Sequence, residues 1–237
     1  MKQLFTIASS VLMLMAVQSD CQTVYSGTIG KAAVEFVIGD VFDDSQHIEA
    51  VYLYEKYRDP ISLNGGYYQN TLTFNESDRG KIVFRSYDPK KTSLEGIWTN
   101  VSTKKARKIV LTRKYDFDLY DTTESDWPRE LLQPVSLNSY FFKIIVQEAA
   151  IIGIRILEKK TGALFQEIDG LECHYLRFRS VLVEDIKLDG KVGFQIYNGG
   201  QRETLEDGTS GPWMDMWLTF LFNSDKKKFI ESGIEYK

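Results

Sequence analysis

Short runs of alternating apolar and polar residues fill the first half of the chain. Val34, Phe36 and Ile38 occupy alternate positions, so their side chains face the same side of a strand. Turn residues such as Asp78-Arg79-Gly80 recur every ~8–12 residues, which is typical of a β-barrel or β-sandwich. Because no segment here has the period of an amphipathic helix, the pattern predicts an antiparallel β-domain, barrel-like or sandwich-like, over residues 22–114.

Two turn signals predict hairpins. Asn64-Gly65 separates two apolar runs, and Asn-Gly readily adopts the positive φ angles of a type I′ turn. Lys159-Lys160-Thr161-Gly162 follows another apolar run, and we expect Gly162 to take the left-handed conformation there.

Residues 115–135 break the alternation and are predicted to form an acidic linker or a long exposed loop. Its acidic residues are Asp116, Asp118, Asp121, Glu124, Asp126 and Glu130. Pro128 and Pro134 interrupt any strand. The segment would either attract a cationic partner or serve only as a solvated connector.

From residue 136 the β pattern resumes with more strongly apolar strands, such as Tyr140–Gln147 and Ile151–Glu158. We therefore predict an all-β protein with a second antiparallel β-domain, sandwich-like or propeller-like, over residues 136–237.

The run from Trp213 to Phe222 has two contrasting faces. One is wholly apolar and predicted to be core; it holds Met214, Met216, Leu218, Phe220 and Phe222. The other carries Trp213, Asp215 and Trp217. Two indoles beside a carboxylate suit a recognition platform for a sugar or a protein loop. The alternative is a second buried layer in which the linker covers both indoles.

An acidic loop offers a candidate metal site. Asp185, Asp189 and Gly190 match the spacing of Asp-x-Asp/Asn-x-Asp-Gly calcium loops. Lys187, however, occupies the middle ligand position, and Gly193 occupies the late acidic position. Calcium binding by Asp185 and Asp189 therefore competes with two alternatives: an ordinary Asp-Gly hairpin turn, or an ion pair in which the lysine ammonium replaces the metal.

Composition narrows the class of partner. The chain has 237 residues, a net charge of −4 and a pI near 5.4. This acidic balance argues against nucleic acid, because binding to phosphates requires a basic face.

Residues 1–21 resemble a secretory signal peptide, with Lys2 before an apolar segment at residues 4–17. Cleavage after Ser19 and cleavage after Cys21 both fit. We therefore expect export to the periplasm or the extracellular space, and no later run is long and apolar enough to span a membrane.

The fate of Cys21 determines the cysteine chemistry. It lies where a lipoprotein cysteine would be, although Asp20 departs from the small residue expected before a lipid anchor. A retained, unlipidated Cys21 could form a disulfide with Cys173. Otherwise Cys173 is a lone buried thiol.

Catalytic motifs are scarce. Cys173 and His174 are adjacent, so on a strand they face opposite sides and cannot act as nucleophile and base. The chain has only two histidines, no Gly-x-Ser-x-Gly elbow and no clustered zinc ligands. We therefore predict a non-enzymatic protein without a cofactor, although sequence alone cannot exclude a carboxylate pair.

Several short motifs together resemble a known group of proteins. In the C-terminal half these are Ala163-Leu164-Phe165-Gln166-Glu167-Ile168, Val183-Glu184-Asp185-Ile186-Lys187-Leu188-Asp189-Gly190, Met216-Trp217-Leu218 and Lys228-Phe229-Ile230. This half resembles bacterial periplasmic immunity proteins that block lysozyme-like effectors. The resemblance implies a propeller-like domain with a calcium loop. The N-terminal half is similar to an uncharacterised β-domain of exported bacterial proteins.

These observations lead to three functional hypotheses. The first is an exported binding protein that inhibits a lysozyme-like cell-wall hydrolase through its acidic and tryptophan-bearing surfaces. The second is a carbohydrate-binding or structural protein of the cell envelope. The third is a hydrolase that acts through two carboxylates.

Overall fold

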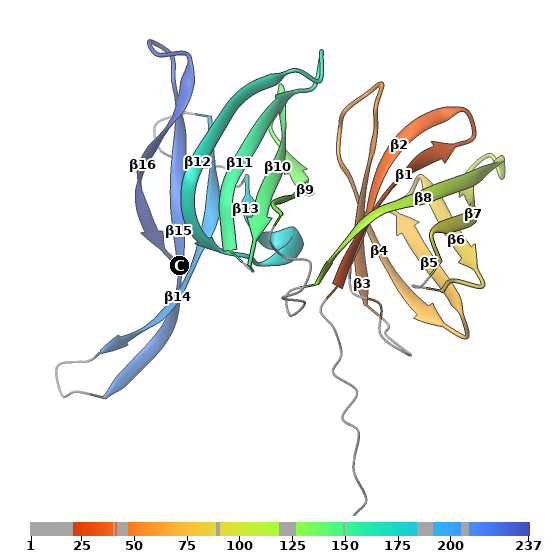
Figure 1. Cartoon of the computed structure of the whole chain (residues 1–237), viewed down its shortest axis with the longest axis horizontal. Coiled ribbons are helices and arrows are strands. Elements are labelled where there is room, and N and C mark those ends of the chain that lie inside the picture. The colour runs from red at the N-terminus through yellow and green to blue at the C-terminus, as the bar shows by residue number, and fades with distance from the viewer. Residues whose placement is uncertain are drawn as a thin grey trace, which may run out of the picture.

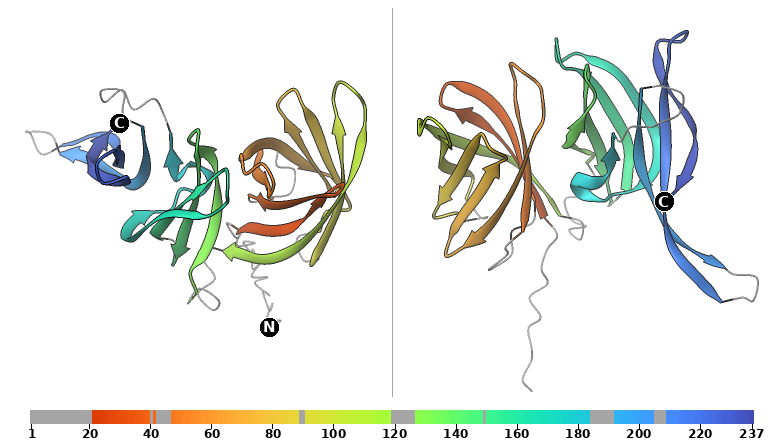
Figure 2. Two further views of the ribbon diagram at one scale, coloured as in Figure 1. Left: turned by 90° about the horizontal axis from the view of Figure 1, so that it is seen from above. Right: turned by 180° about the vertical axis from the view of Figure 1, so that it is seen from behind.

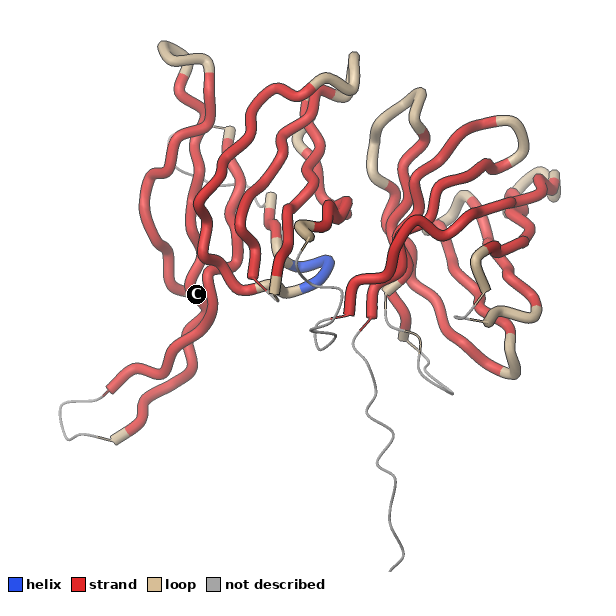
Figure 3. The backbone as a smooth tube through the Cα atoms, viewed as in Figure 1, coloured by secondary structure: helices blue, strands red, loops and turns tan. Residues whose placement is uncertain are grey.

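The computed structural model describes residues 21–39, 41, 47–88, 91–118, 127–148, 150–183, 192–204 and 209–237. Strands dominate these residues, and the one helical turn among them is the 3-10 segment η1 at Arg177–Arg179 (Figure 3). They form a barrel followed by two sheets (Figure 1), so the predicted all-β class is confirmed.

The N-terminal half is a closed antiparallel barrel of eight strands in sequential order. Pairing of the first strand with the last, for example Ile29 with Ile109, closes it. The barrel form of the predicted N-terminal domain is therefore confirmed. Its strands are β1 (Cys21–Ile29), β2 (Ala32–Ile38), β3 (Ile48–Tyr54), β4 (Ile61–Tyr68), β5 (Thr71–Glu76), β6 (Gly80–Arg85), β7 (Ser93–Asn100) and β8 (Ala106–Asp118).

Side chains fill the barrel interior. Val34, Phe36 and Ile38 all belong to the core inside the barrel, as their alternation predicts. The Phe36 ring stacks on Tyr52 with centroids 5.5 Å apart and meets the edge of Phe84 at 6.0 Å. The interior is thus packed apolar core, as in other small barrels.

The C-terminal half forms two four-stranded antiparallel sheets, each a meander of consecutive strands. The first contains β9 (Arg129–Ser136), β10 (Tyr140–Gln147), β11 (Ala150–Glu158) and β12 (Leu164–His174). The second contains β13 (Val181–Leu182), β14 (Gly193–Thr204), β15 (Ser210–Asn223) and β16 (Lys228–Tyr236).

The β9–β12 sheet is the middle layer, between the barrel and the β13–β16 sheet (Figures 1 and 2). One hydrophobic cluster joins all three layers. It contains Val37 and Val51 from the barrel, Phe142 from β10 and Phe194 from β14, and the last two rings lie 4.9 Å apart. The two central strands of the middle sheet, β10 and β11, are accordingly its most apolar and most deeply buried strands.

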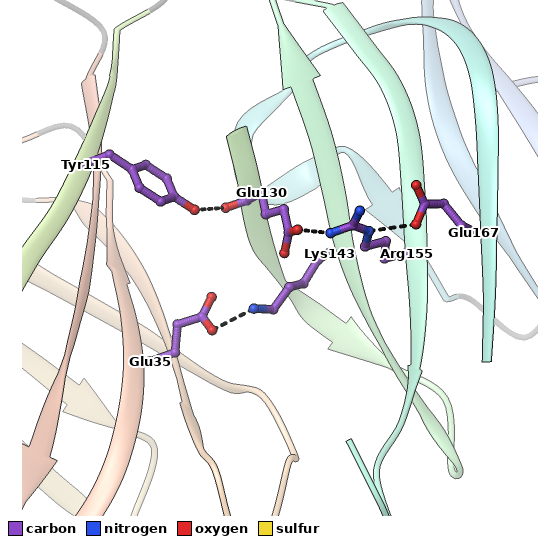
Figure 4. Close-up of polar contacts among 6 residues, drawn as sticks. All are labelled: Glu35, Tyr115, Glu130, Lys143, Arg155 and Glu167. Carbon is purple, nitrogen blue, oxygen red and sulfur yellow. Dashed lines mark hydrogen bonds and ion pairs between the residues drawn. The ribbon is translucent and has the colours of Figure 1, made fainter. Parts of the chain in front are cut away.

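Polar contacts cross the boundary between barrel and middle sheet (Figure 4). Lys143 Nζ lies 2.6 Å from Glu35 Oε2, and both side chains are largely buried. The Tyr115 hydroxyl donates to the Glu130 carbonyl at 2.6 Å. Burial, reinforced by the nearby Glu35 and Glu130 carboxylates, raises the pKa of Tyr115 to about 12, so this hydroxyl keeps its proton.

Parts of the predicted linker are strand. Residues 115–118 extend β8, and residues 129–135 belong to β9. Pro134 is tolerated because β9 is the edge strand of its sheet. In addition, the register shifts here: Leu132 pairs with Lys143 and Ser136 with Phe141, which leaves residues 133–135 in a bulge.

The hairpin predicted at Asn64-Gly65 was wrong, because both residues lie inside β4. The chain turns instead at Gln69 and Asn70, whose φ angles are 46° and 58°. A Cβ on Gly65 would lie 1.9 Å from the Thr73 carbonyl oxygen, so glycine is needed there for close strand contact. The second predicted turn is confirmed: Gly162 has φ 76°.

The Lys143–Glu35 pair provides a test of the boundary. Lys143→Ala should lower the free energy of unfolding by about 1–3 kcal/mol, because it leaves a largely buried carboxylate without its partner. The matched control is Lys108→Ala: Lys108 pairs with Glu95 at 2.9 Å, but both side chains are more than 60% exposed. That control should cost less than about 1 kcal/mol. Urea denaturation measures both, and equal losses would contradict a buried boundary.

Candidate functional site: the β14–β15 ribbon

Strands β14 and β15 continue past the rest of their sheet as a two-stranded ribbon (Figure 1). The β16 partner ends at Tyr236, opposite Met216, and the backbone of Lys237 bonds that of Asp215. On the other side, β13 pairs only with Gln195 and Ile196. Among the described residues, 200–204 and 210–214 therefore pair with each other and with no third strand.

Trp213 is the prominent side chain of this ribbon and is 59% exposed. Its indole lies against Gly200 on β14, where an added Cβ would come within 2.3 Å of the ring. Its Nε1 donates to Asp215 Oδ1 at 3.1 Å. The contact with Gly200 and the hydrogen bond fix the ring orientation while leaving much of its surface in solvent.

Trp217 lies on the same strand face but is only 6% exposed. The Tyr197 ring packs against it with centroids 5.3 Å apart, and Lys237 Nζ lies 5.8 Å from the indole centroid. Trp217 is therefore buried, as the alternative of a second buried layer predicts, whereas Trp213 is exposed, as the recognition platform requires. The described residues that cover Trp217 come from β14 and the C-terminus.

Asp215 lies between the Trp213 indole and the Tyr197 ring and contacts both. Besides the indole, it lies 3.5 Å from the Tyr197 hydroxyl. Burial, and then the charge of Asp215, raise the pKa of Tyr197, so the phenol remains a neutral donor to this carboxylate. The sequence prediction that Trp213, Asp215 and Trp217 share one face is borne out by their packing.

The opposite face of β15 is core only in part: Leu218 and Phe220 belong to the core cluster and Phe222 packs against it, as predicted, whereas Met214 and Met216 do not. Leu218 and Phe220 are buried, whereas Met214, Met216 and Phe222 are partly buried. Phe220 stacks on Phe194 with ring centroids 5.1 Å apart. The ribbon is therefore anchored at its base by aromatic packing.

The predicted calcium loop lies outside the described residues. Asp185, Lys187 and Asp189 all fall in the undescribed stretch, and Gly193 begins β14. Within the described part of the chain, no group of three or more histidine, cysteine or acidic side chains could hold a metal ion.

Cys173 is a buried free thiol. Burial, together with the charge of Glu231, raises the pKa of Cys173 to about 11, so the thiol is protonated at neutral pH. His174 is exposed and lies beside Gly199, so the two neighbours face opposite sides as expected. The backbone of Cys21 pairs with Asp118 at one end of the barrel, and its side chain is outside the description.

Two carboxylates, Glu130 and Glu167, both bind the Arg155 guanidinium (Figure 4). The hydrogen bond from Arg155 lowers the pKa of Glu167. A catalytic general acid requires the opposite shift. Asp116 likewise pairs with Arg113, at 2.7 Å. Two acidic residues of the predicted linker, Asp116 and Glu130, are thus already paired with arginine side chains of the chain itself.

Sequence reasoning missed a concave surface of about 600 Å³ on the outside of β4 and β5. Among the residues that the structure describes, the lining includes no lysine, arginine or carboxylate: His47, Asn64, Gly65, Gly66, Tyr68, Gln69, Thr71, Thr73 and Asn75. Cross-strand pairing brings Asn64 beside Asn75 and Tyr68 beside Thr71. The alternation of small polar residues on both strands is the signal that could have revealed it.

Comparison of the chain with protein-family models, curated proteins and solved structures finds no match. The resemblance to periplasmic immunity proteins therefore stays a prediction. No helix among the described residues is long and apolar enough to cross a membrane.

The state of Cys173 can be tested by thiol titration of the full chain. The folded Cys21→Ser variant should react slowly with a disulfide reagent, because its remaining thiol is buried and protonated. In denaturant it should release one equivalent promptly. In the unsubstituted, unreduced chain, denaturation should again expose a titratable Cys173 thiol. A chain that yields a thiol only after reduction would instead support a Cys21–Cys173 disulfide.

Proposed function

We propose that this chain is a non-catalytic binding protein whose β14–β15 ribbon docks a protein partner through Trp213. The supporting observation is an indole that is 59% exposed and yet held by Gly200 and Asp215. Tryptophan is enriched among the residues that dominate protein–protein affinity. A ring that is already oriented loses little conformational entropy on binding.

The charge of the ribbon favours a cationic partner. Residues 200–215 contain one cation, Arg202, and four carboxylates: Glu203, Glu206, Asp207 and Asp215. One positive minus four negative charges gives a local net charge of −3. A chain segment with this net charge attracts a basic protein over long range and raises its association rate. Together with the family resemblance, this points to a lysozyme-like cell-wall hydrolase as the partner class.

Trp213→Ala tests this role. The substitution should weaken binding to a cationic muramidase by at least ~2 kcal/mol, about thirtyfold in Kd, because it removes the central apolar anchor. The matched control is Trp127→Ala. Trp127 is 73% exposed but lies two residues before β9, a strand of the sheet that does not contain the ribbon. Calorimetric titration at low and high salt measures Kd, and we expect affinity to fall as salt rises.

Three results would contradict this proposal: equal losses in the two tryptophan variants, affinity independent of salt, or no binding to any cationic muramidase. Hydrolysis of cell-wall substrate by the chain itself would instead favour the carboxylate-hydrolase hypothesis.

A second candidate function is glycan binding at the β4–β5 surface. Sugars present hydroxyl groups to amide and hydroxyl side chains, and their flat C–H faces to aromatic rings. Asn64, Thr73 and Asn75 supply the polar groups, and the exposed Tyr68 ring supplies the flat surface. The Tyr68 hydroxyl accepts a hydrogen bond from Gln69 Nε2 at 3.1 Å, which restricts the ring.

Tyr68→Ala tests the glycan site. Binding to peptidoglycan fragments should weaken by roughly tenfold, the loss expected for one stacking contact of about 1.4 kcal/mol. Tyr236→Ala removes a similarly exposed tyrosine from β16 and should leave binding unchanged. Titration followed by amide NMR shifts locates the site. Shifts confined to Trp213 and its neighbours would place the glycan on the ribbon and reject the barrel surface.

A further inference from the structure

The barrel end that holds the β1–β2 and β3–β4 turns contains an open pocket of about 920 Å³. Its lining comes from β1, β2, β3, β8 and the β1–β2 and β3–β4 turns: Ile29, Gly30, Lys31, Ala32, Ala33, Tyr54, Glu55, Lys56, Tyr57, Arg58 and Arg107. None of these residues figured in the sequence-based hypotheses. Volumes of this size accommodate an organic ligand of several tens of atoms.

The pocket is basic in a protein that is acidic overall. Four of its side chains are cationic, namely Lys31, Lys56, Arg58 and Arg107, against the single carboxylate of Glu55. Within the described part of the chain, none of these four forms an ion pair. The neighbouring turns at this end add Arg79, Lys104 and Lys105 against one further carboxylate, Asp78. The resulting field favours an anion.

Two of the cations have restricted positions. The Arg107 guanidinium lies 5.4 Å from the centroid of the Trp98 ring, and its side chain packs against Gly30. Arg58 Nη1 donates to the carbonyl of Lys160 at 3.3 Å, across the boundary to the β11–β12 turn. The pocket therefore presents at least two pre-oriented guanidinium groups, which suit planar contacts with an oxyanion.

The pocket also provides an aromatic wall. Tyr54 and Tyr57 meet edge to face with centroids 6.2 Å apart, and Tyr54 contacts the core ring of Tyr52 in the same way at 5.3 Å. Lys56 Nζ lies 5.5 Å from the centroid of the Tyr57 ring. The wall would contact the organic part of a ligand while the cations hold its charged group.

The nearest buried carboxylate does not cancel this field. Glu76 is buried inside the barrel, and Trp98 Nε1 donates to its Oε2 at 2.7 Å. The Arg107 guanidinium lies over the face of the same Trp98 ring. One indole therefore contacts both the buried Glu76 carboxylate and the exposed Arg107 cation. The pocket itself retains more positive than negative side chains.

We propose that this pocket binds an organic phosphate, with the phosphoryl group held by Arg107, Arg58 and Lys56 and the organic group against Tyr57. Arginine binds phosphate through paired N–H donors, and lysine adds a mobile positive charge. The ligand would be either a free phosphate monoester or a phosphodiester polymer of the cell envelope, because both present anionic phosphoryl oxygens to the guanidinium groups. This inference is independent of the ribbon.

Titrations of the full chain with glucose 6-phosphate, inorganic phosphate and glucose, followed by amide NMR, test the proposal. Glucose 6-phosphate should bind more tightly than inorganic phosphate, because it also contacts the tyrosine wall, and glucose should bind more weakly than either. The shifts should centre on the amides of Gly30, Ala33 and Tyr57. Comparing a poly(glycerol phosphate) chain with glycerol 3-phosphate distinguishes the two sources. Tighter binding of the chain indicates a phosphodiester polymer, and tighter binding of glycerol 3-phosphate indicates a free monoester.

The combined variant Lys56→Gln with Arg107→Gln should weaken binding of glucose 6-phosphate by at least roughly tenfold, the loss of about one charge-assisted contact. Lys108→Gln is the matched control, because Lys108 pairs with Glu95 outside this pocket. Both sites are exposed, and an unchanged melting temperature would confirm folding. Equal binding by variant and control, shifts elsewhere on the barrel, or no binding of either phosphate would overturn the proposal.

Discussion

Apolar contact between the outer wall of the barrel and the middle sheet is the constraint on which the rest of the structure depends. A barrel strand ordinarily buries one face and exposes the other. In β2 and β3, however, Phe36 and Tyr52 point into the barrel core, while Val37 and Val51 join the cluster shared with the sheets. Each such side chain contributes about 1.5–3 kcal/mol when fully buried. The barrel therefore keeps a core of its own inside, while a second hydrophobic cluster joins its outer wall to both sheets.

The polar groups at this boundary follow from the same packing. A lysine and a glutamate in such a setting must pair, as Lys143 and Glu35 do, since an unpaired charge there would be costly. The boundary also shapes a surface feature: Arg58 lines the basic pocket and reaches the carbonyl of Lys160 in the middle sheet's turn. The orientation of that guanidinium thus depends on how the two halves pack, although the pocket belongs to the barrel.

Local patterns in the sequence predicted the β class and many of the strands, but not the end of β8, the whole of β9 or the contacts between distant strands. Alternation identified Val34, Phe36 and Ile38 as core, and the turn residues up to Gly162 identified the turn there. Asn64-Gly65 misled because pairing with β3 and β5 outweighed its turn propensity. The cover of Trp217 comes partly from Lys237, and the basic pocket joins Lys31 to Arg107. Residues so far apart in the sequence leave no local pattern. Closure of the barrel and the pairing of the C-terminal strand are therefore evident only in the three-dimensional structure.

Trp213 combines structural and recognition roles for a physical reason. A two-stranded ribbon without a third strand is only marginally stable in water. The indole packed on Gly200 and bonded to Asp215 adds the cross-strand contact that such a ribbon needs, just where β16 stops pairing. One face of the ring stiffens the ribbon, and the surface left in solvent is thereby presented in a fixed orientation. Trp217, four residues nearer the sheet, has Tyr197 and Lys237 over it and supports the base of the ribbon instead.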